Sequence, residues 1–266
     1  MSLYWPFGTR QGGMRSRLIF ALDLSSIPET LKLVECLRGE VGMFKVGKQL
    51  FLHAGPQIVH MIRDAGGEVF LDLKFHDIPR TVAKAAVEAT RMGVRMFDVH
   101  ASGSLEMMQR TVSEVTKVCR AEGLRRPKVL AVTVLTSLNR DDLKRVGVSS
   151  GVENQVVRLA RLAKEANMNG VVASPQEIAP IRKECGRGFL IVTPGVRLRG
   201  GTWEDQKRVM TPESAIRAGA DYLVIGQPIR EAQDPVAAAR DIVAAMERGL
   251  TNPDRRSRPD AEESKG

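Results

Sequence analysis

Short apolar runs alternate with longer amphipathic segments along most of the chain. The apolar runs are rich in Val, Ile, Leu and Phe and have the length of buried β-strands. They cover residues 17–24, 42–48, 68–74, 96–102, 128–135, 170–175, 189–195 and 222–228. The segments between them repeat apolar residues at helical spacing, as in PETLKLVECLRG, where Leu31, Val34 and Leu37 share one stripe. The pattern therefore predicts eight strands that alternate with helices.

Strands that alternate with helices form right-handed β-α-β units and a parallel sheet. Eight such units in about 230 residues favour an α/β fold of one domain, the closed (β/α)8 TIM barrel. An open, doubly wound sheet is the alternative, but it more often carries a glycine-rich dinucleotide turn after its first strand, and ALDLSSIPET has none. We expect the barrel over residues 17–249, after a flexible N-terminal arm (1–16) and before a disordered polar tail (250–266).

Composition is that of a globular protein, with 43% hydrophobic and 27% charged residues in a chain of 266. No apolar run is long enough to span a bilayer, and MSLYWPFGTRQGG lacks the apolar core of a signal peptide. We therefore expect a cytoplasmic protein with no membrane partner. The three cysteines lie far apart without C-x-x-C spacing, which argues against a disulfide framework or a zinc site.

The formal net charge of +9 raises the question of a polyanionic partner. Part of this charge lies in the N-terminal arm, and segments such as RLARLAKEAN carry basic residues on a solvated helical face. Aromatic residues make up only 5% of the chain and do not interleave with clusters of Lys and Arg. We expect no nucleic-acid partner, whereas a small anionic substrate fits the charge.

In a (β/α)8 barrel, the chemistry lies at the carboxyl ends of the strands. Polar and charged residues gather at these predicted ends: Asp23, Lys45, Lys48, Asp72, Lys74, Asp98, His100, Thr133, Thr136, Ser137, Thr193, Arg197 and Gln227. Side chains two apart on a strand share a face, so Asp72 and Lys74 are expected to point the same way. An inert barrel has no reason to collect charges on one rim.

The stretch FLDLKFHDIPRTV contains both acids of the candidate site and one of its lysines. Taken singly, Asp77 is typical of a helix N-cap before Pro79, Lys45 of a rim lysine, and Asp72 with Lys74 of a partly buried ion pair. Desolvation can cancel the attraction within such a pair, so two acids and two lysines together are poor stabilisers. They are better explained as a catalytic network of alternating charges.

The second half of the chain adds features of an anion site. Gly195 and Gly226 allow a ligand to approach the backbone closely, and Arg197 can bind an oxyanion through two hydrogen bonds. The loops after the seventh and eighth strands are the usual phosphate site of this fold. The long loop between Val196 and Thr211 is expected to be a lid over the ligand, and a plain surface insertion is the alternative.

The stretches FALDL, KVGKQLF, FLDLKFHDIPRTV, AVTVLTSL and TPGVR, with AGADYLVIG near the end, together resemble the orotidine 5'-monophosphate decarboxylases. The similarity covers residues 17 to about 247. It implies conversion of orotidine 5'-monophosphate to UMP and CO2 in de novo pyrimidine biosynthesis. It also implies that no metal or organic cofactor takes part and that the enzyme is a homodimer.

The resemblance assigns roles to the charged residues. Lys74 is expected to stabilise the carbanion-like C6 of the pyrimidine and then to protonate it. Asp72 would face the substrate carboxylate and raise the energy of the bound substrate. Lys45 and Asp77 would complete a charged tetrad. Asp77, with Ile78 and Thr81, would serve the site of the partner subunit.

The remaining roles concern the rest of the substrate. Asp23 and Lys45 would hold the ribose hydroxyls, Thr136 or Ser137 would lie near the base, and Arg197, Gln206 and the region of Gly226 would take the phosphate. One position departs from the family, which usually has arginine where this chain has Gln227. Loss of that charge is expected to weaken phosphate binding by about 1.5–3 kcal/mol. We expect activity to survive with poorer affinity and turnover.

Two rival functions remain. A related barrel enzyme that acts on phosphosugars through a metal-stabilised enediolate shares D-x-K, but the continuation DIPRTV and the lack of an evident metal-binding acid argue against it. A non-catalytic nucleotide-binding barrel is the other rival. It would have no reason to keep all four charges of the network.

Overall fold

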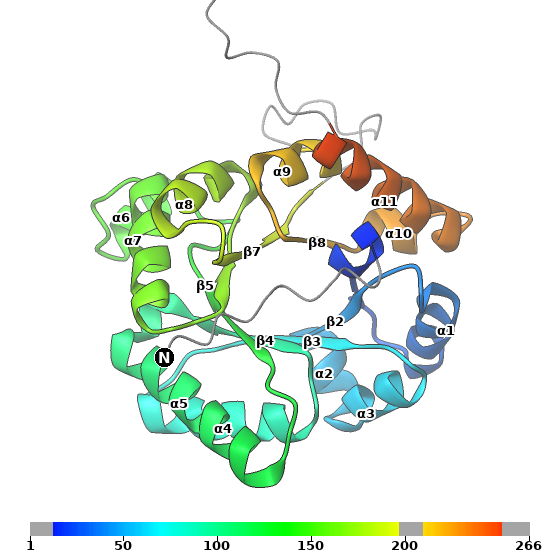
Figure 1. Ribbon diagram of the computed structural model, residues 1–266, viewed down its shortest axis with the longest axis horizontal. Helices are drawn as coiled ribbons and strands as arrows, with labels where there is room; N and C mark the ends of the chain where they lie inside the picture. Colours follow the sequence, from blue (N-terminus) through cyan, green and yellow to red (C-terminus); the bar gives the residue numbers. More distant parts are fainter. Residues whose placement is uncertain (1–12, 197–209, 252–266) are drawn as a thin grey trace, which may run out of the picture.

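The computed structural model describes residues 13–196 and 210–251. Within them, eight parallel strands hydrogen-bond in chain order, and β8 pairs with β1 to close a barrel (Figure 1). The strands are β1 (Leu18–Ala21), β2 (Met43–Gly47), β3 (Val69–Phe75), β4 (Met96–His100), β5 (Lys128–Val132), β6 (Gly170–Val172), β7 (Leu190–Pro194) and β8 (Tyr222–Ile225). The predicted single-domain (β/α)8 barrel is confirmed.

Helices surround the strands in the order of the chain (Figure 1). They are α1 (Ile27–Leu37), α2 (Lys48–Ala54), α3 (Gln57–Asp64), α4 (Pro79–Arg91), α5 (Leu105–Glu122), α6 (Arg140–Arg145), α7 (Val152–Glu165), α8 (Ile178–Cys185), α9 (Pro212–Ala218), α10 (Gln227–Arg230) and α11 (Pro235–Thr251). Short 3-10 helices form at η1 (Gly13–Arg17), η2 (Ala101–Gly103) and η3 (Pro175–Glu177). No helix of the described segments is both long and apolar enough to cross a membrane.

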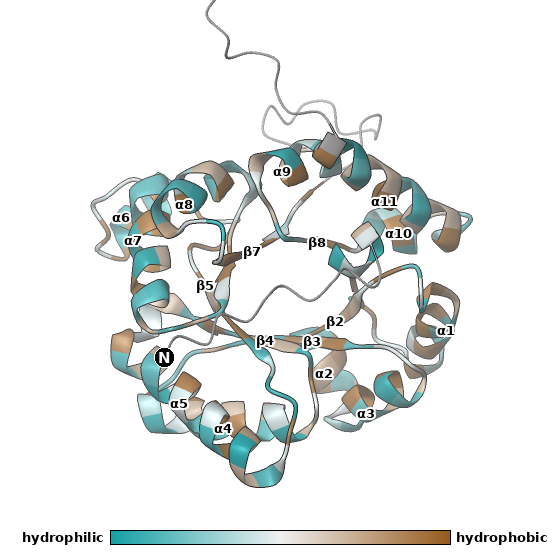
Figure 2. Ribbon diagram, viewed as in Figure 1, coloured by the Kyte–Doolittle hydropathy of each residue, from teal (hydrophilic) through white to brown (hydrophobic). Residues whose placement is uncertain are grey.

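Two layers of apolar side chains hold the barrel together. The inner layer fills the barrel itself, with Ile19, Met43, Phe70, Met96 and Leu130 among its members. The outer layer lies between strands and helices, so the strands are apolar on both faces while the helices alternate apolar and polar faces (Figure 2). Each large side chain buried in this way contributes about 1.5–3 kcal/mol to folding.

Several strands end sooner than the apolar pattern predicted. β1 ends at Ala21 rather than at residue 24, β5 at Val132 rather than 135, and β8 at Ile225 rather than 228. The residues beyond these strand ends form the barrel rim. Some of them, such as Leu22 and Leu24, pack in the outer core, and others, such as Val134 and Leu135, line a cavity, and a strand pattern cannot distinguish either role from pairing.

Candidate active site

A cavity of about 360 Å³ opens at the carboxyl ends of the strands. Seven of the predicted site residues line it, namely Asp23, Lys45, Asp72, Lys74, Thr136, Gly226 and Gln227. Apolar residues that the predicted site did not include complete the wall: Ala21, Phe70, Val132, Val134, Leu135, Val172, Ala173, Pro194 and Val224, with Gly195 beside them. The cavity therefore combines one charged side with an apolar side.

Asp72 joins two lysines on the charged side. The Lys45 ammonium lies 3.3 Å from Asp72 Oδ2 and 3.0 Å from Asp23 Oδ1. Lys74 donates from Nζ to Asp72 Oδ1. Acids and lysines thus alternate from β1 to β3, as the sequence predicted for Asp72, Lys45 and Lys74.

Burial and charge act in opposite directions on this network. Burial alone would lower the pKa of Lys45, but the charges of Asp72 and Asp23 outweigh it and raise that pKa. Burial would likewise raise the pKa of Asp72, yet Lys45, a hydrogen bond with Asp98 and the charge of Lys74 hold it below its ordinary value. Asp72 therefore stays ionised and Lys45 protonated at neutral pH.

Lys74 reaches Asp72 through an irregular strand. Its φ angle is 53°, in the left-handed region that side-chain-bearing residues rarely adopt. The register of β3 against β4 shifts at this point. Leu71 pairs with Phe97 and Phe75 with Val99, so β3 advances four positions while β4 advances two. A bulge of this kind redirects a side chain at the rim of a barrel. The expected proximity of Asp72 and Lys74 is present, but simple two-residue alternation does not produce it.

Asp98 on β4 supports the bulge and had no predicted role. It is completely buried, and its Oδ1 accepts a 2.8 Å hydrogen bond from the Lys74 backbone N–H. Burial, with the adjacent charge of Asp72, raises the pKa of Asp98 well above its ordinary value. An aspartate within the apolar run MFDVHA was the available signal in the sequence.

Asp77, Ile78 and Thr81 do not line the cavity. All three are exposed, with Ile78 66% exposed. The alternative that Asp77 caps α4 is wrong, because Ile78 is the N-cap residue and Asp77 Oδ1 accepts a hydrogen bond from the adjacent Ile78 N–H at 2.6 Å. The helix does begin at Pro79, as predicted.

Some of the other predicted ligand residues lie at the rim, and the rest fall in residues 197–209, which the structure does not describe. Thr136 lines the cavity, whereas Ser137 is exposed and does not. Gly195 has a φ angle of 76°, a conformation that favours glycine, and its position has open space around it. Arg197, Gln206 and most of the predicted lid lie outside the described residues.

Gln227 begins α10 at the cavity edge, and its amide donates to Glu231 Oε2 at 2.9 Å. Arg230, one turn later, donates instead to the main-chain oxygen of Asp23 at 2.9 Å and to Glu231. Arg230 is not part of the cavity wall. The end of the cavity formed by β8 therefore carries an uncharged amide where a cation would suit a phosphate.

His76 and His100 stack at 5.2 Å between ring centroids beside the bulge. Burial, reinforced by His76 and Lys74, lowers the pKa of His100 to about 4. Within residues 13–196 and 210–251, no three or more His, Cys, Asp and Glu side chains are grouped in a way that could hold a metal ion.

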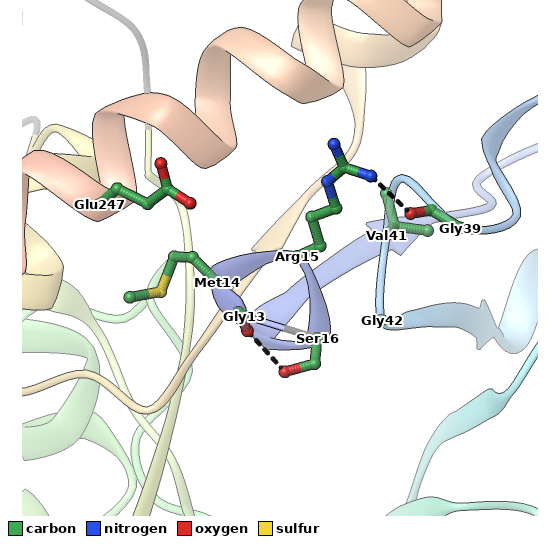
Figure 3. A pocket seen from close by; sticks show the side chains of 8 residues that line it. All are labelled: Gly13, Met14, Arg15, Ser16, Gly39, Val41, Gly42 and Glu247. Carbon is green, nitrogen blue, oxygen red and sulfur yellow. Dashed lines mark hydrogen bonds between the residues drawn. The ribbon is translucent and has the colours of Figure 1, made fainter. Parts of the chain in front are cut away.

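A second hollow, of about 510 Å³, lies at the opposite end of the barrel (Figure 3). Its wall includes Gly13, Arg15, Gly39 and Glu247, and the Arg15 side chain is already bonded to the carbonyl of Gly39. The amino ends of the strands serve stability rather than chemistry in this fold. The cavity with the charged network is thus the candidate active site.

Residues 16–242 match the model of the orotidine 5'-phosphate decarboxylase / HUMPS family. The chain belongs to this family. It is 57% identical to the orotidine 5'-phosphate decarboxylase of Geobacter sulfurreducens, over 86% of this chain and 95% of that protein. It is 54% identical to that of Geotalea daltonii, over 88% of this chain and 98% of the relative.

A solved orotidine 5'-phosphate decarboxylase from Lactobacillus acidophilus has the same fold, with a TM-score of 0.77 and 34% identity over 86% of this chain and 98% of that one. Family membership makes the chain an enzyme, a carboxy-lyase. The resemblance stated from its motifs is confirmed.

Proposed function

We propose that the protein converts orotidine 5'-monophosphate to UMP and CO2 in pyrimidine biosynthesis. The observation that carries this proposal is the Lys45–Asp72–Lys74 network on the wall of the cavity. All three similar proteins named above are orotidine 5'-phosphate decarboxylases. The cavity offers an apolar wall for a flat base and a protonated amine for the reacting carbon.

Decarboxylation breaks the bond between C6 and the carboxyl carbon, and the electron pair of that bond stays on C6. CO2 departs, and C6 must then receive a proton. Lys74 suits both needs, because its positive charge stabilises the developing carbanion and its Nζ–H then supplies the proton. Proton uptake from water restores the lysine, so atoms and charge balance without a further reactant.

Asp72 would face the substrate carboxylate. Because Lys45 and Lys74 keep it ionised, a second carboxylate beside it is repelled, and departure of CO2 relieves the repulsion. The same aspartate aligns Lys74 through a direct hydrogen bond. Both effects favour the transition state over the bound substrate.

The remaining contacts follow the expected layout of the substrate. Asp23 and Lys45 would bind the ribose hydroxyls, and Thr136 or Ser137 would lie near the base. Gly226 and Gln227, with Arg197 and Gln206, would bind the phosphate. Binding energy at the phosphate, far from C6, can then contribute to catalysis through closure of the loop that follows β7.

The functional unit would be a homodimer in which Asp77 completes the site of the other subunit. Asp77, Ile78 and Thr81 are all exposed and lie outside the cavity of their own subunit, which suits residues that serve the site of a partner. The three residues would lie against the partner's substrate.

The test is loss of the orotate absorption band when purified protein is mixed with orotidine 5'-monophosphate, with and without a metal chelator. We expect turnover that the chelator does not affect and that Lys74→Ala abolishes. Lys117→Ala is the matched control, because Lys117 is an exposed lysine on α5 that pairs with Glu114 far from the cavity wall. It is expected to leave turnover unchanged.

Other outcomes would point to the rivals. Activity lost with the chelator would favour the metal-dependent phosphosugar enzyme. A folded protein that binds UMP tightly without turnover would favour the nucleotide-binding barrel.

A further inference from the structure

Asp98 is buried at the base of the charged network. Met96, two residues earlier on β4, fills the barrel interior, so Asp98 points to the same side by strand alternation. Its partner on β5 is the apolar Leu130. A carboxyl group in this position needs a structural or chemical reason, because burying it unpaired is costly.

One oxygen of Asp98 holds the backbone of Lys74. At the bulge in β3, the regular hydrogen bonds between β3 and β4 are interrupted. Asp98 Oδ1 accepts a hydrogen bond from the Lys74 N–H there, at 2.8 Å. Lys74 has its left-handed backbone at this residue. The side chain of Asp98 thus replaces the ladder bond and stabilises a conformation that lysine would otherwise avoid.

Asp72 lies beside Asp98, because the preceding residues, Leu71 on β3 and Phe97 on β4, are paired across the two strands. Asp98 Oδ2 is buried, and among the described residues it has no hydrogen-bond partner. Two carboxyl groups can share a hydrogen bond only if one of them carries a proton. Asp72 forms ion pairs with two lysines, whereas Asp98 is completely buried and forms no ion pair within the described residues, so the proton belongs on Asp98.

We propose that Asp98 is a positioning residue, a neutral acid that accepts the Lys74 N–H at Oδ1 and donates from Oδ2 to Asp72. One side chain would then set both the backbone of the lysine and the orientation of the acid beside it. Its influence on the reaction passes entirely through these two groups. The inference rests on the proposed function for its kinetic consequences but not for the protonation state of Asp98.

Two variants, Asp98→Asn and Asp98→Leu, distinguish a role of Asp98 through its hydrogen bonds from a role through a negative charge. Asparagine keeps an acceptor and a donor in the same places, so kcat is expected to stay within about threefold of the parent. Leucine removes both bonds and releases the bulge, so kcat is expected to fall by about 100-fold, the cost of misplacing a reacting group. KM for orotidine 5'-monophosphate is expected to change by less than about threefold, since the proposed phosphate and ribose contacts remain.

Infrared difference spectroscopy between the parent and Asp98→Asn tests the proton directly. We expect the carbonyl band of a neutral carboxylic acid at neutral pH in the parent, absent from the Asn variant, whether or not the protein turns over substrate. Lack of turnover with the band present would overturn the proposed function and leave the neutral Asp98 standing.

Two results would overturn the inference itself. One is the absence of the infrared band together with an Asn variant as impaired as a Leu variant, which would mean that Asp98 acts as a charge. The other is a folded Leu variant with unchanged kcat. If the Leu variant fails to fold, the Asn variant and the infrared band still decide the matter.

Discussion

At the scale of single residues, environment rather than residue type sets the roles of the acids. Asp72 lies between two lysines and is ionised, while Asp98, one strand away, forms no ion pair within the described residues and has a raised pKa. The sequence predicted that Lys45, Asp72 and Lys74 lie together at the rim, because parallel strands end together. It listed Asp98 at a strand end but gave it no role, since an acid inside an apolar strand looks the same whether it points inward or outward.

Gln227 carries the first prediction at this scale. Gln227→Arg is expected to raise kcat/KM for orotidine 5'-monophosphate by about 10- to 100-fold, the equivalent of about 1.5–3 kcal/mol from one charge-assisted bond to phosphate. Initial rates over a range of substrate concentrations give this ratio. Gln233→Arg, which adds the same charge at an exposed position nearby, is the control and is expected to change little.

Glu231 is expected to reduce the gain in kcat/KM. It accepts a hydrogen bond from Gln227 and can form an ion pair with an arginine introduced at that position. The double variant Gln227→Arg with Glu231→Gln is therefore expected to exceed the single variant. An unchanged kcat/KM in both would mean that another basic residue already neutralises the phosphate.

His100 gives a prediction about pH. Its pKa is lowered to about 4 in the folded protein, by burial first and then by His76 and Lys74, against 6.5 for an ordinary histidine. Between these values the unfolded chain binds a proton that the folded chain does not, so stability falls as pH drops from about 6.5 to 4. In urea unfolding at several pH values, the free energy of unfolding of His100→Gln is expected to fall less steeply with decreasing pH than that of the parent. The same change at the exposed His60 is expected to have no such effect.

At the scale of elements, alternation predicted the strands but not the form of every connection. Two helices follow β2, β5 and β8 where the pattern suggested one segment. The signals were local: Gly55, with a φ angle of 74°, and then Pro56 separate α2 from α3, and Asn139 starts α6 with a capping box closed by Asp142. A periodicity argument averages over such short interruptions.

Arg182 on α8 ties several elements together far from the cavity. Its guanidinium donates to the carbonyls of Phe189 and Gly219 at 2.7 and 2.5 Å and to Asp221 Oδ2 at 2.7 Å, and the side chain is 17% exposed. These bonds join α8 to the start of β7 and to the turn between α9 and β8. No periodic pattern in the sequence indicates such a clamp.

Arg182→Met is expected to lower the free energy of unfolding by about 2–4 kcal/mol, because it removes the side-chain donor of the Phe189 and Gly219 carbonyls and one of the cationic partners of Asp221. The midpoint of urea unfolding measures this loss. Arg161→Met, which breaks an exposed pair with Glu184, is expected to cost less than about 1 kcal/mol. Equal losses in the two variants would show that the clamp adds nothing to an ordinary surface pair.

At the scale of the whole molecule, the strands form a closed barrel, and the candidate active site opens at one rim of it. The fold was predictable because eight repeats of the same unit reinforce one another along the chain, so an error at one strand end leaves the topology intact. The segment that contains Arg197 and Gln206 has no such repetition, and the binding of phosphate by these two residues stays a prediction.

The proposed homodimer has a specific test in mixed subunits. Lys74→Ala and Asp77→Ala are each expected to be inactive or nearly so. If Asp77 acts across the interface, mixing the two after gentle dissociation restores about a quarter of the parent activity, because half of the random dimers carry one complete site. Mixing two samples of the same variant is the control. No recovery in confirmed mixed dimers would place Asp77 in the site of its own subunit or outside it.

The bulge in β3 has a consequence for how this scaffold can change over time. Lys74 is oriented by a hydrogen bond to Asp98 on β4, within the closed barrel, whereas Thr136, Gly195 and Gln227 lie on separate connections that follow β5, β7 and β8. Exchange or lengthening of those loops can therefore alter which molecule is accepted without moving the reactive amine. Deletion of a residue from the bulge would instead turn the lysine away from Asp72. New specificities are thus most accessible through the loops, and the acid–lysine pair is the part of the barrel least free to vary.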